Sequence, residues 1–294
     1  MIAAVLPFPN ISPELFSIQI GGMEFALRWY ALAYIVGILL GWMIARAALS
    51  RATLWPGATA PMAKDQLDDL LTWIILGVVV GGRLGFVLFY QPAYYLRNPL
   101  EIPMIWQGGM AFHGGFLGVV VATWIWCQRH NIPKMQTADL LALATPVGIM
   151  LGRIANFINA ELWGRPSDAP WAVIFPGPYA LCDDAPCARH PSQLYEAGLE
   201  GLLLGTILLI LAFGLKALRK PGLIAGTFFA GYGIARFIVE FYRLADAQFI
   251  TEDNPLGHVL RFSDTVGITM GQLLSLPMVA IGLVIIAIGR RQWK

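Results

Sequence analysis

The sequence predicts an all-α membrane protein that crosses the bilayer about seven times, as a single helical domain over residues 1–294. Of the 294 residues, 57% are hydrophobic and only 13% are charged, whereas a soluble protein is about 25% charged. The mean hydropathy is +0.64. A transmembrane helix needs about 20 apolar residues, and apolar segments of that order recur at 27–49, 68–90, 110–127, 138–158, 194–215, 223–241 and 268–289.

The basic residues of the loops indicate how the chain is oriented. One side of the predicted bundle carries eleven of them: Arg46, Arg51, Lys64, Arg129, Lys134, Lys216, Arg219, Lys220, Arg290, Arg291 and Lys294. The other side carries five, in longer loops: Arg97, Arg165, Arg189, Arg243 and Arg261. The richer side is cytoplasmic under the positive-inside rule. We therefore expect an outward N-terminus, a cytoplasmic C-terminus and outward loops at 91–109, 159–193 and 242–267.

Four further arginines lie within or at the ends of the apolar segments: Arg28, Arg83, Arg153 and Arg236. An arginine inside the bilayer costs at least about 2.5–3.5 kcal/mol, so it is rarely present without a partner or a function. These four positions therefore predict a polar site inside the bundle.

Glycines recur at four-residue spacing in the first four segments, as Gly37 and Gly41, Gly77, Gly81 and Gly85, Gly114 and Gly118, and Gly148 and Gly152. Small residues at this spacing let helix backbones approach closely in membranes. We expect tight helix packing at these positions.

The fourth segment ends in a polar stretch, GRIANFINAELWG, at residues 152–164. Arg153, Asn156 and Asn159 fall at three-residue steps, so they share one face of a helix. Glu161 falls on the other side of Arg153, before Gly164 and Pro166 end the helix.

Two interpretations of this stretch are open. Its polar groups could join helices, with Arg153 paired to Glu161 or Glu240. Alternatively, the stretch forms an anion site, because the arginine fork of donors suits phosphate.

His113 lies between paired glycines in WQGGMAFHGGFLG, residues 106–118, at the outer end of the third segment. Glycine permits close approach of a backbone or a ligand, and histidine titrates near neutral pH, so it can serve as acid or base. A packing role is the alternative. No second histidine lies at metal-ligand spacing, so we reject a metal site.

The sixth segment ends in GYGIARFIVEFYR, residues 231–243. Tyr232, Arg236 and Glu240 follow at four-residue steps and so share a helix face. They either form an internal ion pair, or Arg236 faces the same cavity as Arg153 and Glu240 orients one of the two arginines. LRWYALAY, at 27–34, places Tyr30 at the outer end of the first segment, where aromatic residues anchor to the interface.

Two other features are interpreted as structural. RHPSQLYE, at 189–196, opens the fifth segment, with Ser192 as a plausible N-cap and Glu196 early in the helix. Cys182 and Cys187 share a polar loop and could pair in an oxidising compartment. The chain lacks the GxSxG and HExxH patterns of serine and zinc hydrolases, and no basic run suggests nucleic-acid binding.

Together these stretches resemble the prolipoprotein diacylglyceryl transferase family. GRIANFINAELWG is similar to the signature of that family, and GGMAFHGG, RHPSQLYE and GYGIARFIVEFYR resemble its other characteristic stretches in the same order. LRWYALAY and MGQLLSLPM, the latter at 270–278, also fit. The resemblance extends over nearly the whole chain.

The resemblance implies a seven-span enzyme of the bacterial inner membrane with a periplasmic N-terminus. Its family moves the diacylglyceryl group of phosphatidylglycerol onto the thiol of the lipobox cysteine, in the signal peptide of a prolipoprotein. A thioether forms and glycerol phosphate leaves. The implied partners are these two substrates and the bilayer, with no cofactor, metal or nucleic acid.

The resemblance also implies site residues. Arg153, Asn156 and Gly164 match essential signature positions, and Asn159 and Glu161 are assigned with them to substrate binding. His113, Tyr30, Tyr232, Arg236 and Glu240 match residues implicated in activity. His113, Arg153 and Arg236 are the catalytic candidates: His113 as base for the thiol, or an arginine lowering the thiol pKa by its field.

A transporter or channel for an anion is the alternative function. It would need a continuous path and usually repeated halves, and the sequence shows neither. A purely structural scaffold would leave four intramembrane arginines without explanation.

Overall fold

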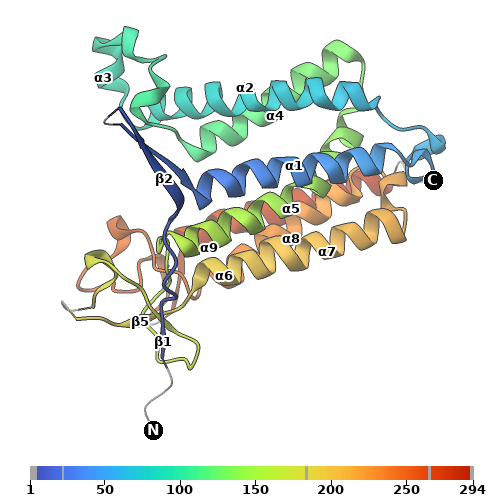
Figure 1. Cartoon of the computed structure of the whole chain (residues 1–294). Helices are drawn as coiled ribbons and strands as arrows, with labels where there is room; N and C mark the ends of the chain where they lie inside the picture. The colour runs from blue at the N-terminus through green and yellow to red at the C-terminus, as the bar shows by residue number, and fades with distance from the viewer. Residues whose placement is uncertain (1–4, 22, 183–184, 264–265, 292–294) are drawn as a thin grey trace. The chain divides into compact units, whose positions relative to one another are not determined.

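The computed structural model describes residues 5–21, 23–182, 185–263 and 266–291, and it is mostly helical (Figure 1). All seven predicted apolar segments form helices. The six continuous ones are α1 (Trp29–Leu49), α2 (Lys64–Phe89), α4 (Phe112–His130), α5 (Lys134–Ile158), α8 (Leu223–Val239) and α9 (Met270–Arg290). The seventh segment is divided into α6 (Ser192–Glu196), the π-helix η6 (Ala197–Leu203), α7 (Leu204–Leu209) and the π-helix η7 (Ile210–Gly214).

The multi-span helical class is therefore confirmed. Within the described residues, five helices are long and apolar enough to cross a membrane: Trp29–Leu49, Lys64–Phe89, Lys134–Ile158, Ser192–Gly214 and Met270–Arg290. The apolar helix α8 is shorter. The count of seven spans and the orientation of the termini remain predictions.

Short elements occupy the loops. They are α3 (Pro92–Arg97) and the 3-10 turns η1 (Ala52–Leu54), η2 (Pro56–Ala58), η3 (Pro99–Glu101), η4 (Ile105–Gln107), η5 (Pro178–Ala180), η8 (Ala217–Arg219) and η9 (Ala247–Phe249). The strands are β1 (Leu6–Pro7), β2 (Glu14–Ile20), β3 (Met23–Arg28), β4 (Val173–Ile174), β5 (Ala188–Arg189), β6 (His258–Arg261) and β7 (Gly267–Thr269). Hydropathy did not predict these strands, because most are too short to show an alternating pattern.

The strands form three small sheets. β4 lies between β1, to which it is parallel, and β5, to which it is antiparallel. The other two sheets are antiparallel hairpins, one of β2 with β3 and one of β6 with β7. Cys182 and Cys187, in the loop between β4 and β5, are joined by a disulfide.

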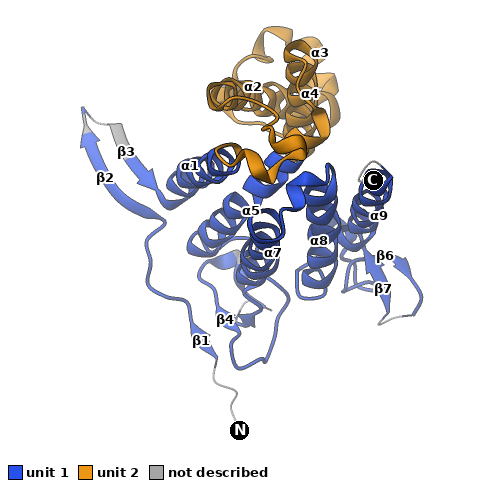
Figure 2. Ribbon diagram, turned by 90° about the vertical axis from the view of Figure 1, so that its right-hand side faces the viewer, with its two compact units in different colours: residues 1–48, 139–294 blue, residues 49–138 orange. Residues whose placement is uncertain are grey.

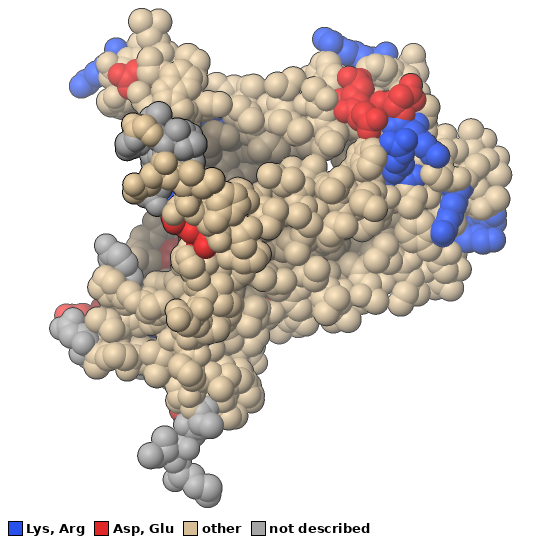
Figure 3. Space-filling model, in the orientation of Figure 1, with Lys and Arg blue, Asp and Glu red and all other residues tan. Residues whose placement is uncertain are grey.

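The chain divides into two compact units, residues 49–138 and residues 1–48 with 139–294 (Figure 2). The single domain over residues 1–294 and its three outward loops remain predictions. In the larger unit, α1, the α6–α7 helix and α9 run in one direction, and α5 and α8 run in the other (Figure 1). The ends of α1, α7 and α9, which are followed by basic residues, therefore lie at one end of this unit (Figure 1). Figure 3, in the same orientation, shows blue side chains on that side of the view.

Glycines hold the helices close together at most of the positions that their spacing predicts. The prediction is wrong at Gly152, where an added Cβ meets no atom within 4 Å. In the smaller unit, a Cβ on Gly81 would lie 2.8 Å from the Cα of Gly118. In the larger unit, a Cβ on Gly37 would lie 3.1 Å from the Cα of Gly148. Backbones at these separations leave no room for a side chain, so α2 packs on α4 and α1 packs on α5 through glycine.

A buried carboxylate fixes the start of α8. Asp139, on α5, is fully buried and accepts hydrogen bonds from the backbone N–H groups of Gly222 at 2.7 Å and Ala225 at 2.8 Å. These N–H groups lie at the N-terminal end of α8, where the first N–H groups of a helix have no acceptor within the helix. The same end carries partial positive charge. Asp139 therefore sets the position of α8 relative to α5.

The N-cap predicted at Ser192 is wrong. Ser192 is the first residue of α6, and its hydroxyl donates instead to the carbonyl oxygen of Leu162, at 3.0 Å. Pro191 takes the capping position, without a side-chain hydrogen bond. The Ser192 hydroxyl thus ties the start of α6 to the loop that follows α5.

We predict that Gly81→Val destabilises the protein by about 1–3 kcal/mol, the usual cost of overpacking. The added side chain would have to push α4 away from α2. Gly148→Ala is the matched control, because a Cβ there meets no atom within 4 Å. Thermal unfolding in detergent should show a lower midpoint for Gly81→Val alone, and equal midpoints for both variants would contradict the packing assignment.

Candidate functional site

The signature stretch leaves its helix earlier than predicted. α5 ends at Ile158, and the chain then turns through positive φ at Ala160 (53°) and Leu162 (60°). This turn brings Glu161 back to the face of Asn156, whose amide donates to Glu161 Oε1 at 2.7 Å. The prediction that Glu161 lies on the other side of Arg153 assumed a continuing helix and is wrong.

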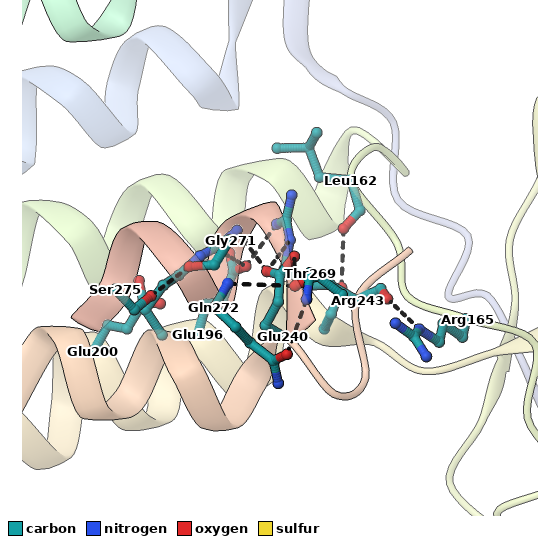
Figure 4. A network of polar contacts seen from close by, with 12 residues as sticks. Leu162, Arg165, Glu196, Glu200, Glu240, Arg243, Thr269, Gly271, Gln272 and Ser275 are labelled. Carbon is teal, nitrogen blue, oxygen red and sulfur yellow. Dashed lines mark hydrogen bonds and ion pairs between the residues drawn. The ribbon is translucent and has the colours of Figure 1, made fainter. Parts of the chain in front are cut away.

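Three arginines converge on the carboxylate of Glu196, near the start of the α6–α7 helix. Figure 4 labels Glu196 and one of these arginines, Arg243. Arg153, from α5, places Nε 2.8 Å from Glu196 Oε2. Arg236, from α8, places Nη1 2.7 Å from Oε1, and Arg243, just beyond α8, places Nη1 2.6 Å from the same oxygen. One carboxylate thus connects three separate segments of the chain.

A second carboxylate, Glu240, completes the cluster. Arg236 Nη2 lies 3.0 Å from Glu240 Oε2, which confirms the ion pair predicted from their four-residue spacing. Arg243 Nε lies 3.5 Å from the same oxygen, and the Thr269 hydroxyl donates to Oε1 at 3.2 Å. A Cβ on Gly271 would lie 2.5 Å from Glu240 Oε1, so glycine is required where α9 begins.

The partners predicted for Arg153 are wrong. Arg153 pairs with Glu196, and its Nη2 lies 4.0 Å from Glu200 Oε2. It does not pair with Glu161 or Glu240. Glu196 and Glu200 both lie in the apolar fifth segment, and Glu200 lies within the π-helix η6, a type of distortion that is frequent at functional sites.

The charges are arranged in depth. The side chains of Glu196 and Glu200 are 0% exposed, whereas those of Arg153, Arg236 and Arg243 are 22%, 18% and 15% exposed. The glutamates therefore lie deeper than the arginines that pair with them, and the exposed surface of the three pairs with Glu196 belongs to the arginine side chains. A partly desolvated arginine face of this kind can bind an anion such as phosphate through directed N–H donors.

Tyrosines border this face. Tyr232 precedes Arg236 by one helical turn, and its hydroxyl is close enough to interact electrostatically with the side chains of Glu200 and Arg153. The Tyr30 and Tyr34 hydroxyls, on α1, are 3.1 Å apart, and Tyr34 lies within electrostatic range of Arg153 and Glu161. The structure thus brings Tyr30 and Tyr232 to the neighbourhood of the arginines from two different helices.

Gly164 lies where the signature loop passes between two other segments. Its N–H donates to the carbonyl oxygen of His190 at 2.8 Å. A Cβ there would collide with the carbonyl oxygen of Tyr242 and would lie 2.8 Å from the His190 Cβ. Gly164 is therefore required for packing, and it holds the loop against the segment that carries Arg243.

The loop is supported by polar and aromatic contacts at its outer side. Tyr195 accepts a hydrogen bond from the Trp171 indole at 2.7 Å, and its hydroxyl lies 3.0 Å from His190 Nδ1. Burial lowers the pKa of His190 below its ordinary value, opposed by the charge of Asp168. The lowered pKa favours the neutral imidazole, whose Nδ1 can accept a hydrogen bond from the Tyr195 hydroxyl in one of its two tautomers.

A pocket of about 410 Å³ opens beside the signature loop. Asn159 and Glu161 supply its polar groups, and its apolar wall includes Phe8, Ile11, Pro13 and Trp163. The Oδ1 atom of Asn159 is buried without a hydrogen-bond partner among the described residues. Asn159 and Glu161 thus bring the polar part of the signature stretch to the wall of this pocket.

The other intramembrane arginines and His113 belong to other parts of the chain. Arg28, at the end of β3, makes an exposed ion pair with Glu14 at 3.5 Å, a type of contact that contributes little. Arg83 is buried in the smaller unit. His113 lies in the first turn of α4, also in the smaller unit, exposed and edge-on to Phe112, and its predicted role as a base remains a prediction.

Sequence reasoning missed three members of the cluster. Arg243 was counted among outward loop residues, although it follows Arg236 by seven positions. Glu196 was interpreted as an ordinary residue of a helix start, and Glu200 was not considered. The available signal was two acidic residues, four apart, in an apolar segment.

Fold and site together define a class, a multi-span membrane protein with a buried arginine–glutamate site. Residues 14–288 match the family model described as prolipoprotein diacylglyceryl transferase. The chain is 66% identical over 283 residues to the phosphatidylglycerol–prolipoprotein diacylglyceryl transferase of Ruegeria pomeroyi, covering 95% of this chain and 96% of the relative. It is 58% identical to the enzyme of that name from Roseobacter denitrificans, covering 98% of each. The chain belongs to the prolipoprotein diacylglyceryl transferase family.

We predict that Glu196→Gln destabilises the protein by about 3–5 kcal/mol, because removing one partner leaves buried charges uncompensated. Three guanidinium groups would lose the negative charge that they share, and glutamine would replace one of the two accepting oxygens with an NH2 group that cannot accept. Glu200→Gln is the control. Glu200 is equally buried, but it makes a single ion pair among the described residues, with Arg153, at the longer distance of 4.0 Å. Thermal unfolding in detergent should place the midpoint of Glu196→Gln well below that of Glu200→Gln, and the reverse order would contradict the central role of Glu196.

Proposed function

We propose that this protein transfers the sn-1,2-diacylglyceryl group of phosphatidylglycerol to the thiol of the lipobox cysteine of prolipoproteins. The product is a thioether, glycerol phosphate is released, and the reaction is the first step of lipoprotein maturation. The observation that carries this proposal is the accessible arginine face over buried glutamates, within a helical membrane protein. Relatives 66% and 58% identical to the chain, named for the same two substrates, support it.

The chemistry suits such a face. The thiolate attacks the glycerol carbon that bears the phosphate, the S–C bond forms, and the C–O bond breaks with its electron pair going to the phosphate oxygen. Negative charge therefore grows on the leaving phosphate. Guanidinium groups already fixed by carboxylates stabilise that charge more in the transition state than in the ground state.

Each signature residue then has a proposed role. Arg153 and Arg236 bind the phosphate, since glutamates fix the position of both guanidinium groups and both side chains are partly exposed. Asn156, Asn159 and Glu161 orient the substrate beside them. Tyr30, Tyr232 and Glu240 complete the binding face, and Gly164 acts through the position of the signature loop.

The thiol proton needs an acceptor, and we assign this role to His113. The alternative is that Arg153 or Arg236 lowers the thiol pKa by its field alone, since arginine hardly deprotonates. The substrates imply the remaining partners, which are the signal peptide of the prolipoprotein and the bilayer. The corresponding location is the inner membrane of the bacterial cell, with the site toward its outer side.

The proposed function is tested with purified protein in detergent, phosphatidylglycerol and a lipobox peptide. Mass spectrometry should detect a diacylglyceryl adduct on the cysteine. Arg153→Lys should lose most of this activity, because an ammonium keeps the charge but not the planar fork, and Arg153→Ala should lose it fully. No adduct from folded protein would refute the reaction, and near-normal turnover by Arg153→Lys would refute the phosphate clamp.

The role of His113 is tested by the pH dependence of the same reaction. If His113 is the base, activity falls at low pH as the imidazole becomes protonated. His113→Gln should then abolish activity or shift the active range to higher pH, where the thiol ionises unaided. An unchanged pH–rate profile in His113→Gln would remove this residue from proton transfer and leave the arginine field as the explanation.

A further inference from the structure

The segment between α2 and α4 exposes an unusual amount of apolar surface. Phe89, at the end of α2, is 82% exposed, Leu96 and Leu100 are each 83% exposed, and Trp106 is 76% exposed. Tyr90, Tyr94, Ile105, Met110 and Phe112 are exposed as well. Among residues 89–112, the charged side chains are those of Arg97 and Glu101 alone. We call residues 89–112 the apolar segment.

Arg83 organises this segment from α2. Its Nε donates to the carbonyl oxygen of Ile102 at 2.7 Å, and Nη2 donates to that of Glu101 at 2.8 Å. Its Nη1 donates to the carbonyl oxygens of Gly108 at 2.6 Å and Gly109 at 3.3 Å. The guanidinium therefore contacts four backbone carbonyls and, within the described residues, no carboxylate.

The surroundings of Arg83 are built for this contact. Its guanidinium lies over the Tyr95 ring, 5.0 Å from the ring centre, and the residue is only 4% exposed. Gly108 and Gly109 both have positive φ, 85° and 81°. A Cβ on Gly109 would lie 2.8 Å from Arg83 Nη1, so glycine is required for the carbonyls to reach the arginine.

A loop in water would not need such an arginine, because water would hydrogen-bond the carbonyls. In an apolar medium, irregular backbone must be satisfied internally, since each free polar group costs several kcal/mol. Arg83 supplies these hydrogen bonds. The exposed apolar side chains and the carbonyl groups that hydrogen-bond to Arg83 therefore both indicate that this segment lies in surroundings with little water.

The position of the apolar segment, directly after α2, indicates that membrane lipid covers its exposed surface. α3 begins at Pro92, three residues after α2 ends at Phe89, so it lies at most about 11 Å further along the chain. The neighbouring surfaces of α2 and α4 expose Leu84, Leu88, Phe116 and Leu117, which face acyl chains when these helices span a membrane. Tyrosine and tryptophan are the residues enriched where a span meets the headgroups.

We infer that the apolar segment lies in the membrane–water interface at the end of α2, and that Arg83 permits this by replacing water at its carbonyls. Interfacial segments of this kind enter about 5–10 Å into the headgroup region. His113, which follows directly at the start of α4, is then held at the depth of the phospholipid phosphates. This explains Arg83, one of the two intramembrane arginines that the arginine–glutamate site does not use.

Fluorescent probes test the placement. A single cysteine is introduced as Leu96→Cys or Leu100→Cys in a Cys127→Ala background, without reduction of the Cys182–Cys187 disulfide, and is labelled with an environment-sensitive dye. The control is Glu252→Cys, an exposed position in the loop 242–267. The protein is placed in vesicles of phosphatidylethanolamine and phosphatidylglycerol, with nitroxide-labelled lipid or aqueous iodide as quencher.

Dyes at residues 96 and 100 should emit at shorter wavelength than the control, and lipid nitroxide should quench them several-fold more strongly than iodide does. Quenching by iodide to the level of the control would overturn the inference. Protection from both quenchers would also overturn it, because a protein partner would then cover the segment.

The role of Arg83 is tested in the Leu100→Cys protein with Arg83→Lys. Lysine keeps the charge but cannot reach four carbonyls at once, so the dye should shift to longer wavelength and become accessible to iodide. A spectrum unchanged in the folded variant would remove Arg83 from the explanation. The position of the apolar segment in the interface is tested by the proteins that retain Arg83. That test therefore does not depend on whether the Arg83→Lys variant folds.

Discussion

The carboxylate of Glu196 is the constraint on which the larger unit depends. It is fully buried, and arginines from α5, from α8 and from just beyond α8 all lie within 2.8 Å of it. Apolar burial does little to hold helices together within a membrane, so packing and polar contacts take that role. The cluster thus joins three segments and, with the same contacts, builds the face that we propose to bind phosphate.

The depth of the charges explains how one cluster can serve both purposes. Because Glu196 and Glu200 lie deeper than the arginines, an anion that arrives at the open face does not need to displace them. The guanidinium groups are oriented before substrate binds, so little reorganisation is needed as charge develops on the phosphate. Gly164 and the Ser192 hydroxyl keep the signature loop close to this face, each by a backbone contact.

The sequence predicted what depends on local pattern and missed what depends on which helices are neighbours. Apolar length located all seven helices, glycine spacing located close packing, and four-residue spacing located the pair of Arg236 with Glu240. The partners of Arg153 come from another helix, so no spacing could supply them. The turn after Ile158 was also missed, because Ala160 and Leu162 are not residues that usually adopt positive φ.

The intramembrane arginines also show how a supporting arginine differs from one that we propose to bind substrate. Arg83 gives four hydrogen bonds to carbonyl oxygens and is 4% exposed, so almost all of its donor capacity is used inside the protein. Arg153 directs one short ion pair at Glu196 and keeps 22% of its side chain exposed. Neutral carbonyls cannot balance the charge of Arg83, which fits a position near headgroups, whereas glutamates balance Arg153 and leave its side chain partly exposed to an anion. Partner type and exposure, rather than depth in a span, separate the two roles.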